Sequence, residues 1–268
     1  MEKIINRKNK YKIVLDCETC PIDNTIEGVE PKNMLAYDIG FAVVDKLGNV
    51  YESYSFIVKE IFLGEYGKME SAYYYNKLPI YWYDLSVRNR ELESFKNIKA
   101  IFADCVERYH IEEVYAHNMR FDYHALNTTC KWVSYGNDKQ FFPKGLKICD
   151  TLKFSHNVIC KTPTYKKFCQ ENGYLKKNGQ PNEKAETIYR YITKDNEFIE
   201  SYTGLEDVLI EKEILRYCYS KHKKGSQLMW VVGVFEKYRF LGGNPPPTTI
   251  PARFLKKVVD KIKIKSYN

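Results

Sequence analysis

Two acidic residues, Asp16 and Glu18, follow the apolar run Ile13-Val14-Leu15 and are separated by one residue. The run is typical of a buried β-strand, and residues i and i+2 of a strand point to the same face. The two carboxylates should therefore lie side by side where the strand leaves the core. Two anions held this close repel each other unless a cation lies between them, and rigidly held oxygen ligands suit Mg²⁺ or Mn²⁺. The alternative is a strand end that carries two solvated acids.

A third acid, Asp122, lies near the start of a predicted helix. The short apolar segment Val114-Tyr-Ala116 is typical of a strand, and a helical pattern follows it from Phe121 to Lys131. Asn118 lies four residues before Asp122, so we expect the two side chains to share one face of a helical turn. A carboxylate at a helix N-terminus often does no more than stabilise the helix dipole.

A fourth acid, Asp207, lies one turn inside a long amphipathic segment that reaches about Lys221. Thr203 and Glu206 have the spacing of a capping box, which predicts that this helix starts at Thr203. Tyr202 would then lie just ahead of the first turn, on the same side as Asp207.

In this order, the motifs resemble those of the DEDD superfamily of 3′→5′ exonucleases, which includes the DNA polymerase III epsilon subunit and ribonuclease T. The resemblance covers roughly residues 10 to 220. It is nearest to the small stand-alone exonucleases of phages and low-GC bacteria, whose third motif has a context similar to that of residues 198–207 here. The residues that carry it are Asp16-x-Glu18-Thr19, Asn118-x-x-Phe121-Asp122, and Tyr202 five positions before Asp207.

The resemblance implies a two-metal-dependent hydrolysis of phosphodiester bonds from the 3′ end of single-stranded DNA, in DNA replication or repair. It implies that Asp16, Glu18 and Asp207 hold the Mg²⁺ or Mn²⁺ ion that carries the nucleophile, and that Asp16 with Asp122 holds a second ion. Tyr202 would contact the attacking water. The residues expected at the substrate are Cys17, Thr19, His117, Asn118 and Phe121, with ordinary packing as the alternative role of His117.

Tyr202 departs from the family pattern. The branch with the five-residue spacing has His at this position, and the branch with Tyr places it four residues before its Asp. An imidazole with a pKa of about 6.5 accepts a proton at neutral pH, whereas a phenol with a pKa of about 10 orients water by hydrogen bonding. Two alternatives to a DNA exonuclease remain. One is an exoribonuclease that uses the same site on short RNA, and the other, favoured by Tyr202, is a catalytically weakened nucleic-acid-binding protein.

The composition favours a polyanionic partner. The chain has 268 residues and a net charge of +8, with 42 basic against 34 acidic side chains. Eleven Lys and Arg but two Asp and Glu lie from Lys221 to the end, so this segment accounts for the whole excess. A basic surface attracts nucleic acid. The 23 Tyr and 14 Phe offer flat faces for unpaired bases, or they belong to the core.

We expect an α/β fold in which a mixed five-stranded sheet is covered by helices, and the resemblance implies the ribonuclease H-like strand order. A turn at Leu47-Gly48-Asn49 predicts an antiparallel hairpin between the second and third strands. A long helix is expected from about Arg90 to Tyr109. Residues 60–85 either cover the core, the favoured reading, or flank the substrate groove. The predicted strands are Ile13–Cys17, Ile39–Val44, Tyr51–Val58, Glu113–Ala116 and Lys147–Cys149.

These elements make up a predicted exonuclease domain over residues 1–222, followed by a basic C-terminal extension over residues 223–268. The extension should form a helix at Leu228–Phe240, a Pro-rich break at 242–247 and a short basic helix at Arg253–Lys265. This last segment would grip the nucleic-acid backbone or dock on another subunit, in a homodimer or a replication complex. A solvated basic face is the alternative.

The eight cysteines do not have the spacing of a disulfide or zinc framework. Cys17-x-x-Cys20 lacks a second pair, and His156, Cys160 and Cys169 form only a weak alternative set of zinc ligands. Reduced thiols favour a cytoplasmic protein, and the resemblance implies the cytoplasm of a bacterium or a phage-infected host. No apolar run approaches about 18 residues, and no charged-then-apolar leader is present, so we expect no membrane partner.

Overall fold

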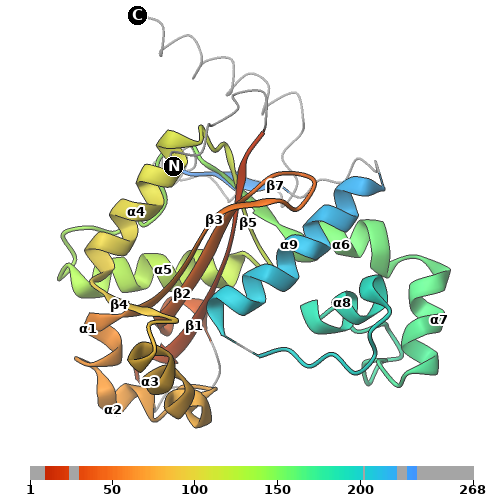
Figure 1. The fold of residues 1–268 in the computed structure, drawn as a ribbon, viewed down its shortest axis with the longest axis horizontal. Helices are drawn as coiled ribbons and strands as arrows, with labels where there is room; N and C mark the ends of the chain where they lie inside the picture. Colours follow the sequence, from red (N-terminus) through yellow and green to blue (C-terminus); the bar gives the residue numbers. More distant parts are fainter. Residues whose placement is uncertain (1–9, 24–29, 202, 222–227, 234–268) are drawn as a thin grey trace, which may run out of the picture. The chain divides into compact units, whose positions relative to one another are not determined.

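The computed structural model describes residues 10–23, 30–201, 203–221 and 228–233 (Figure 1). Within these ranges the chain forms a seven-stranded sheet in the order β4-β3-β2-β1-β5-β6-β7. The strands are β1 (Lys12–Pro21), β2 (Met34–Val44), β3 (Val50–Val58), β4 (Glu91–Glu93), β5 (Glu113–Ala116), β6 (Lys147–Asp150) and β7 (Leu228–Val231). The helices are α1 (Lys59–Phe62), α2 (Tyr66–Met69), α3 (Leu78–Ser86), α4 (Phe95–Arg108), α5 (Arg120–Val133), α6 (Thr151–Ser155), α7 (Pro163–Glu171), α8 (Ala185–Thr193) and α9 (Gly204–Ser220).

The strand directions confirm the predicted fold class. β1, β2 and β3 are antiparallel neighbours, whereas β5 is parallel to β1 and β6 is parallel to β5. The order and directions of these five strands are those expected of a ribonuclease H-like sheet. The predicted number of five is too small, because β4 and β7 extend the sheet at its two edges.

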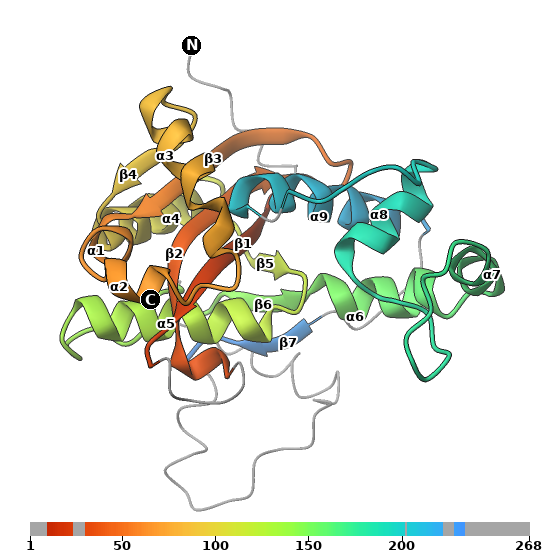
Figure 2. The same cartoon turned by 90° about the horizontal axis from the view of Figure 1, so that it is seen from below.

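Helices cover both faces of the sheet (Figures 1 and 2). Side chains alternate along β1, so Ile13 and Leu15 enter one hydrophobic cluster with residues of α4 and α5. Val14 points to the opposite face and packs in a second cluster with residues of α9, including Val208 and Ile214. Alternate residues of β1 therefore pack against different helices, α4 and α5 on one face and α9 on the other.

The residues from α1 to α3 cover the core, as predicted. Phe62, Met69 and Tyr81 are fully buried, while Tyr73 and Tyr83 on the same segment are mostly exposed. The long helix expected from Arg90 begins later, at α4, where the Ser94 hydroxyl accepts a hydrogen bond of 3.3 Å from the Asn97 N–H. The three preceding residues pair with β3 as β4 instead.

The predicted helix at Leu228–Phe240 is wrong at its start, because Leu228–Val231 form strand β7 beside β6. The Trp230 ring packs edge-on against Tyr123 of α5 at a centroid distance of 4.8 Å, and Val231 is buried. This tertiary packing outweighs the local helical pattern. The rest of that helix, the Pro-rich break and the basic helix lie outside the described residues, and the predicted domain boundary stays a prediction. No helix in the ranges given above is long and apolar enough to cross a bilayer.

Candidate metal centre

β1 places Asp16 and Glu18 on the face of the sheet that α9 covers. Both side chains are half-buried, and Cys17 between them is buried on the opposite face. In the pairing with β2, Asp16 lies opposite Gly40 and Glu18 lies opposite Asp38. The alternation predicted from sequence is confirmed.

Two glycines bring α9 directly onto β2. A Cβ atom on Gly40 would lie 2.3 Å from the carbonyl carbon of Gly204, and one on Gly204 would lie 2.7 Å from the backbone nitrogen of Gly40. Neither position therefore has room for a side chain. The N–H of Gly204 donates a hydrogen bond of 2.9 Å to Oδ2 of Asp38, which holds the helix N-terminus in place. Asp207, one turn further along, is thereby brought to the acids of β1.

The predicted start of α9 is confirmed, but the capping contact differs. Thr203 is the N-cap residue, yet its side chain caps no backbone N–H. Its hydroxyl donates instead to Oε2 of Glu206 at 2.6 Å, and the same oxygen accepts from Nη2 of Arg90 at 2.8 Å. The buried Arg90 guanidinium attracts Glu206 away from the reciprocal contact of a capping box.

Asp16, Glu18 and Asp207 each bring one carboxylate oxygen into a group whose members all lie within 4.8 Å of one another. Asp207 is buried, and its Oδ1 atom has no hydrogen-bond partner among the described residues. A buried carboxylate oxygen without a partner is unfavourable unless a cation or a donor compensates it. Three oxygen ligands on a strand and a packed helix fit a hard divalent cation. In the described part of the chain, His156, Cys160 and Cys169 form no comparable group.

Asp122 approaches β1 from the other side. It lies in the first turn of α5, and its Oδ1 accepts from the backbone N–H of Cys17 at 3.2 Å and from the Cys17 thiol at 3.3 Å. It is not a member of the group of three carboxylates, but its charge is the largest influence on the pKa of Asp16 after burial. The structure thus brings three of the four predicted ligands together and places the fourth beside them.

Burial is the largest cause that raises the pKa of all four carboxyls, and nearby carboxylates add to the effect. The pKa of Asp16 is well above its usual value. Burial, then the charges of Asp38 and Asp207, raise the pKa of Glu18 to about 9. Burial, then the charge of Glu200, raises the pKa of Asp207 to about 8, and burial raises that of Asp122 to about 7. Without a cation, Glu18 and Asp207 retain protons at neutral pH, and a cation that binds them must displace protons.

Glu211 and Lys77 are among the charged residues near the acids that the motifs did not predict. Glu211 is buried one turn after Asp207 on α9, and its Oε2 accepts from the backbone N–H of His117 at 3.0 Å. Its i+4 spacing from Asp207 is the signal that could have identified it. Lys77, which ends a short 3-10 turn before α3, donates to the carbonyl oxygen of Ser201. No local pattern marked Lys77.

The expected face shared by Asn118 and Asp122 is not formed. Asn118 precedes α5 and has φ 71°, so it lies in a turn and not on the helix. Its N–H donates to Oδ1 of Asp150 at 3.2 Å, and this carboxylate also caps α6 through the N–H of Leu152. Asp150 therefore stabilises the turn, and the Asn118 side chain is exposed whereas Asp122 is buried.

The other predicted substrate residues lie in different environments. Thr19 and Cys17 are buried, and Phe121 is partly buried against the core. The His117 ring lies 2.8 Å from the Glu183 carbonyl oxygen through Nε2 and 3.4 Å from the Thr151 hydroxyl through Nδ1. These contacts favour the packing role for His117. Tyr202 lies outside the described residues.

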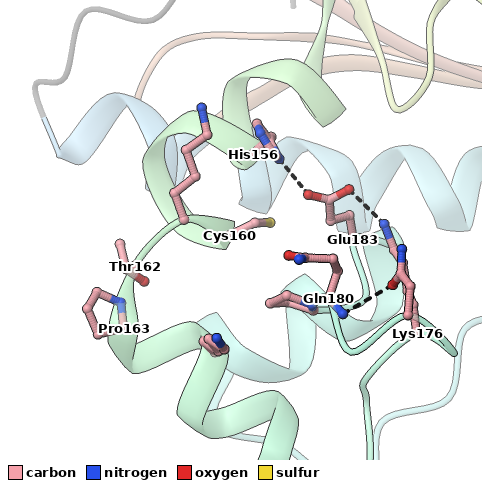
Figure 3. Close-up of a pocket in the computed structure, with 11 residues that line it drawn as sticks. His156, Cys160, Thr162, Pro163, Lys176, Gln180 and Glu183 are labelled. Atoms are coloured by element: carbon pink, nitrogen blue, oxygen red, sulfur yellow. Dashed lines mark hydrogen bonds and ion pairs between the residues drawn. The ribbon is translucent and has the colours of Figure 1, made fainter.

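A pocket of about 530 Å³ lies away from the predicted acids, among α7, the residues before it and the loop that precedes α8 (Figure 3). Glu183 links its walls, because Oε1 lies 2.5 Å from Nδ1 of His156 and Oε2 lies 2.9 Å from Nζ of Lys176. None of the predicted catalytic, metal-binding or substrate residues lines this pocket.

No protein-family model matches this chain, and no curated protein matches it. Among solved structures, the chain is similar to E. coli exonuclease I in complex with a dT13 oligonucleotide, at 11% identity and a TM-score of 0.47 over 80% of this chain. It is also similar to exonuclease X in complex with 5′ overhanging duplex DNA (13%, TM-score 0.38, 81% of this chain and 96% of that one). A third similar structure is S. pombe Pop2p in a Mg²⁺- and Mn²⁺-bound form. Its sequence identity is 13% and its TM-score is 0.45, over 79% of this chain and 83% of that one. The chain spans 41% of the matched exonuclease I chain. At these TM-scores the likenesses carry no argument about activity.

Proposed function

We propose that this protein is a metal-dependent 3′→5′ exonuclease that hydrolyses phosphodiester bonds at the 3′ end of single-stranded DNA. The observation that carries the proposal is the convergence of Asp16, Glu18 and Asp207, where the buried Oδ1 of Asp207 has no partner in the described part of the chain. Burial, together with neighbouring carboxylates, raises the pKa values of these acids, and a divalent cation would offset the cost of their negative charge.

The charges define what each residue would do. A phosphodiester is an anion, so the acidic cluster repels it until cations are bound. Asp16, Glu18 and Asp207 would hold one Mg²⁺ or Mn²⁺ ion, and Asp16 with Asp122 would hold a second. The bound cations supply positive charge to the scissile phosphate and lower the pKa of a water molecule. Tyr202 would orient that water through its hydroxyl, because a phenol with a pKa of about 10 is a weak base at neutral pH.

Two other functions would depend on some of the same features of the chain. An exoribonuclease would use the same acids, since the choice of sugar depends on contacts with the 2′-OH and not on the metal ligands. A nucleic-acid-binding protein with weakened chemistry is favoured by Tyr202, which stands where the family branch with this spacing has His. In both of these functions, the basic charge of the chain would be the source of its affinity for nucleic acid.

The test is degradation of a 5′-labelled single strand, as DNA and as RNA, with Mg²⁺, Mn²⁺ or EDTA. We expect a metal-dependent ladder that shortens from the 3′ end, with DNA degraded faster than RNA. The Asp16→Ala variant should be at least a hundredfold slower, on the order of the loss when one charge-stabilising group is removed. Asp104→Ala, which removes an exposed acid on α4, is the matched control and should match the parent.

Each other result has a defined meaning. Equal rates for Asp16→Ala and the parent would show that the site is assigned wrongly. An intact strand that still shifts on a gel, in a salt-sensitive way, would support the weakened binding protein. In that case Tyr202→His should restore cleavage if the phenol is the defect.

A further inference from the structure

Lys77 is held beside the acidic cluster by the segment that carries it. Lys77 directly precedes α3, and Tyr81 lies one turn later on the same side of that helix. The Tyr81 hydroxyl donates a hydrogen bond of 2.9 Å to Oδ2 of Asp38, the β2 residue paired with Glu18. Since Tyr81 and Asp38 are both fully buried, α3 is anchored next to the strand end that bears the acids.

The ammonium group of Lys77 contacts the segment that leads to Asp207. It donates to the carbonyl oxygen of Ser201, in the segment that leads into α9, and lies over the Tyr74 ring at 5.1 Å from the centroid. Its positive charge acts on Glu18 and Asp207, since it opposes the rise in the pKa of both carboxyls. The same two carboxylates belong to the group of three that fits a divalent cation.

The electrostatic surroundings of Lys77 would change when cations bind. A divalent cation at Glu18 and Asp207 repels a nearby ammonium, with an energy that grows as water is excluded. The nearest new anion is then the phosphodiester that lies against the cations. A half-buried lysine on a flexible four-carbon stem can make this change without a movement of the backbone.

We propose that Lys77 is a substrate-binding residue of this site: it contacts the scissile phosphate when cations are bound at Glu18 and Asp207. The inference rests on the proposed nuclease function and adds a residue that the motifs do not contain. It also gives the segment between β3 and β4 a part in the chemistry, besides its role as a cover of the core.

Three variants separate this role from a structural one. Lys77→Met keeps most of the side-chain length and removes the charge, whereas Lys77→Arg keeps the charge. Lys59→Met is the matched control, because Lys59 is an exposed lysine at the start of the same segment. For each protein we would measure Mn²⁺ binding by calorimetry without nucleic acid, single-turnover cleavage of a 5′-labelled DNA strand with saturating Mg²⁺, and the melting temperature.

We expect Lys77→Met to bind Mn²⁺ about threefold tighter or more, because a competing positive charge is gone. Cleavage by this variant should be about 10- to 100-fold slower, on the scale of one lost charge-stabilising contact. Lys77→Arg should recover most of the rate, and Lys59→Met should resemble the parent in every measurement.

The proposal is overturned if Lys77→Met cleaves as fast as the parent, or binds Mn²⁺ more weakly. A lower melting temperature with slow cleavage that Arg does not recover would also overturn it, since this is the result for a residue that only holds Ser201. A parent protein without metal-dependent cleavage would overturn the proposed function as well. Equal cleavage by an active parent and Lys77→Met overturns the role of Lys77 alone.

Discussion

At the scale of single residues, the acids of this site are held in an unfavourable state that a cation would relieve. Glu18 and Asp207, with pKa values of about 9 and about 8, retain protons that the unfolded chain releases above its usual values of 4.5 and 3.8. The folded state therefore binds more protons than the unfolded state across this range. By linkage, the free energy of unfolding falls as the pH rises towards 9.

We predict that the melting temperature of the EDTA-treated protein falls between pH 7 and pH 9. This pH range lies above the titration of His117, because burial lowers the pKa of His117 below 6.5. Below that pH, His117 would make the free energy of unfolding rise with pH, which is the opposite effect. Excess Mg²⁺ should restore more stability at pH 9 than at pH 7, because cation binding displaces fewer protons there. The Asp207→Asn variant should show a shallower pH dependence. Scanning calorimetry checks this, and a melting temperature that rises with pH in EDTA would contradict it.

At the scale of elements, the site depends on how closely α9 approaches β2. The helix reaches the sheet only because Gly40 and Gly204 lack Cβ atoms, and the Asp38 carboxylate receives the helix N-terminus. Arg90 donates to Asp38, Asp84 and Glu206, so one buried guanidinium joins β2, α3 and the first turn of α9. This arrangement brings a helix residue within ligand distance of strand residues.

We predict that Gly40→Ala lowers the free energy of unfolding by about 1–3 kcal/mol, the usual range for overpacking. It should also weaken Mn²⁺ binding at least tenfold, because α9 must move and take Asp207 with it. Gly67→Ala is the control, since a Cβ there meets no atom within 4 Å and Ala favours the helix. Urea unfolding and calorimetry measure both effects. Unchanged Mn²⁺ affinity in Gly40→Ala would show that Asp207 is not a ligand.

At the scale of the whole molecule, the charge is unevenly distributed. Residues 234–268 carry eight Lys and Arg against two Asp and Glu, which is most of the net charge of +8. β7 ends at Val231, and the buried Val231 and Val232 pack before this basic stretch begins. The end of the described sheet and the start of the basic stretch thus nearly coincide.

We predict that a chain ending at residue 233 keeps the melting temperature of the parent, whereas one ending at residue 221 loses β7 and melts lower. The chain ending at 233 should bind a single-stranded oligonucleotide more weakly at low salt, with a smaller dependence of affinity on salt, because fewer counterions are released. Fluorescence anisotropy at several salt concentrations measures this. An unchanged salt dependence would favour the alternative of docking on another subunit, which sedimentation would detect as a change in oligomeric state.

The sequence by itself determined the features that depend on near neighbours in the chain. Strand alternation placed Asp16 and Glu18 on one face, the turn at Leu47-Gly48-Asn49 predicted the β2–β3 hairpin, and Thr203 marked the start of α9. These rules involve residues within about four positions of one another, where backbone geometry decides the outcome. The acid motifs also pointed to divalent-cation chemistry from the residue types alone.

Only the tertiary structure decided how these local pieces meet. Asp207 joins the acids of β1 because two glycines distant in the chain allow close contact, and Asp122 contacts Cys17 from the other face. Asn118 forms a turn with Asp150 instead of the predicted helical turn with Asp122. Residues 228–231 form strand β7 because they pair with the edge of β6. Long-range contacts depend on which side chains fill or leave the space between elements, and no pattern within one element contains that information.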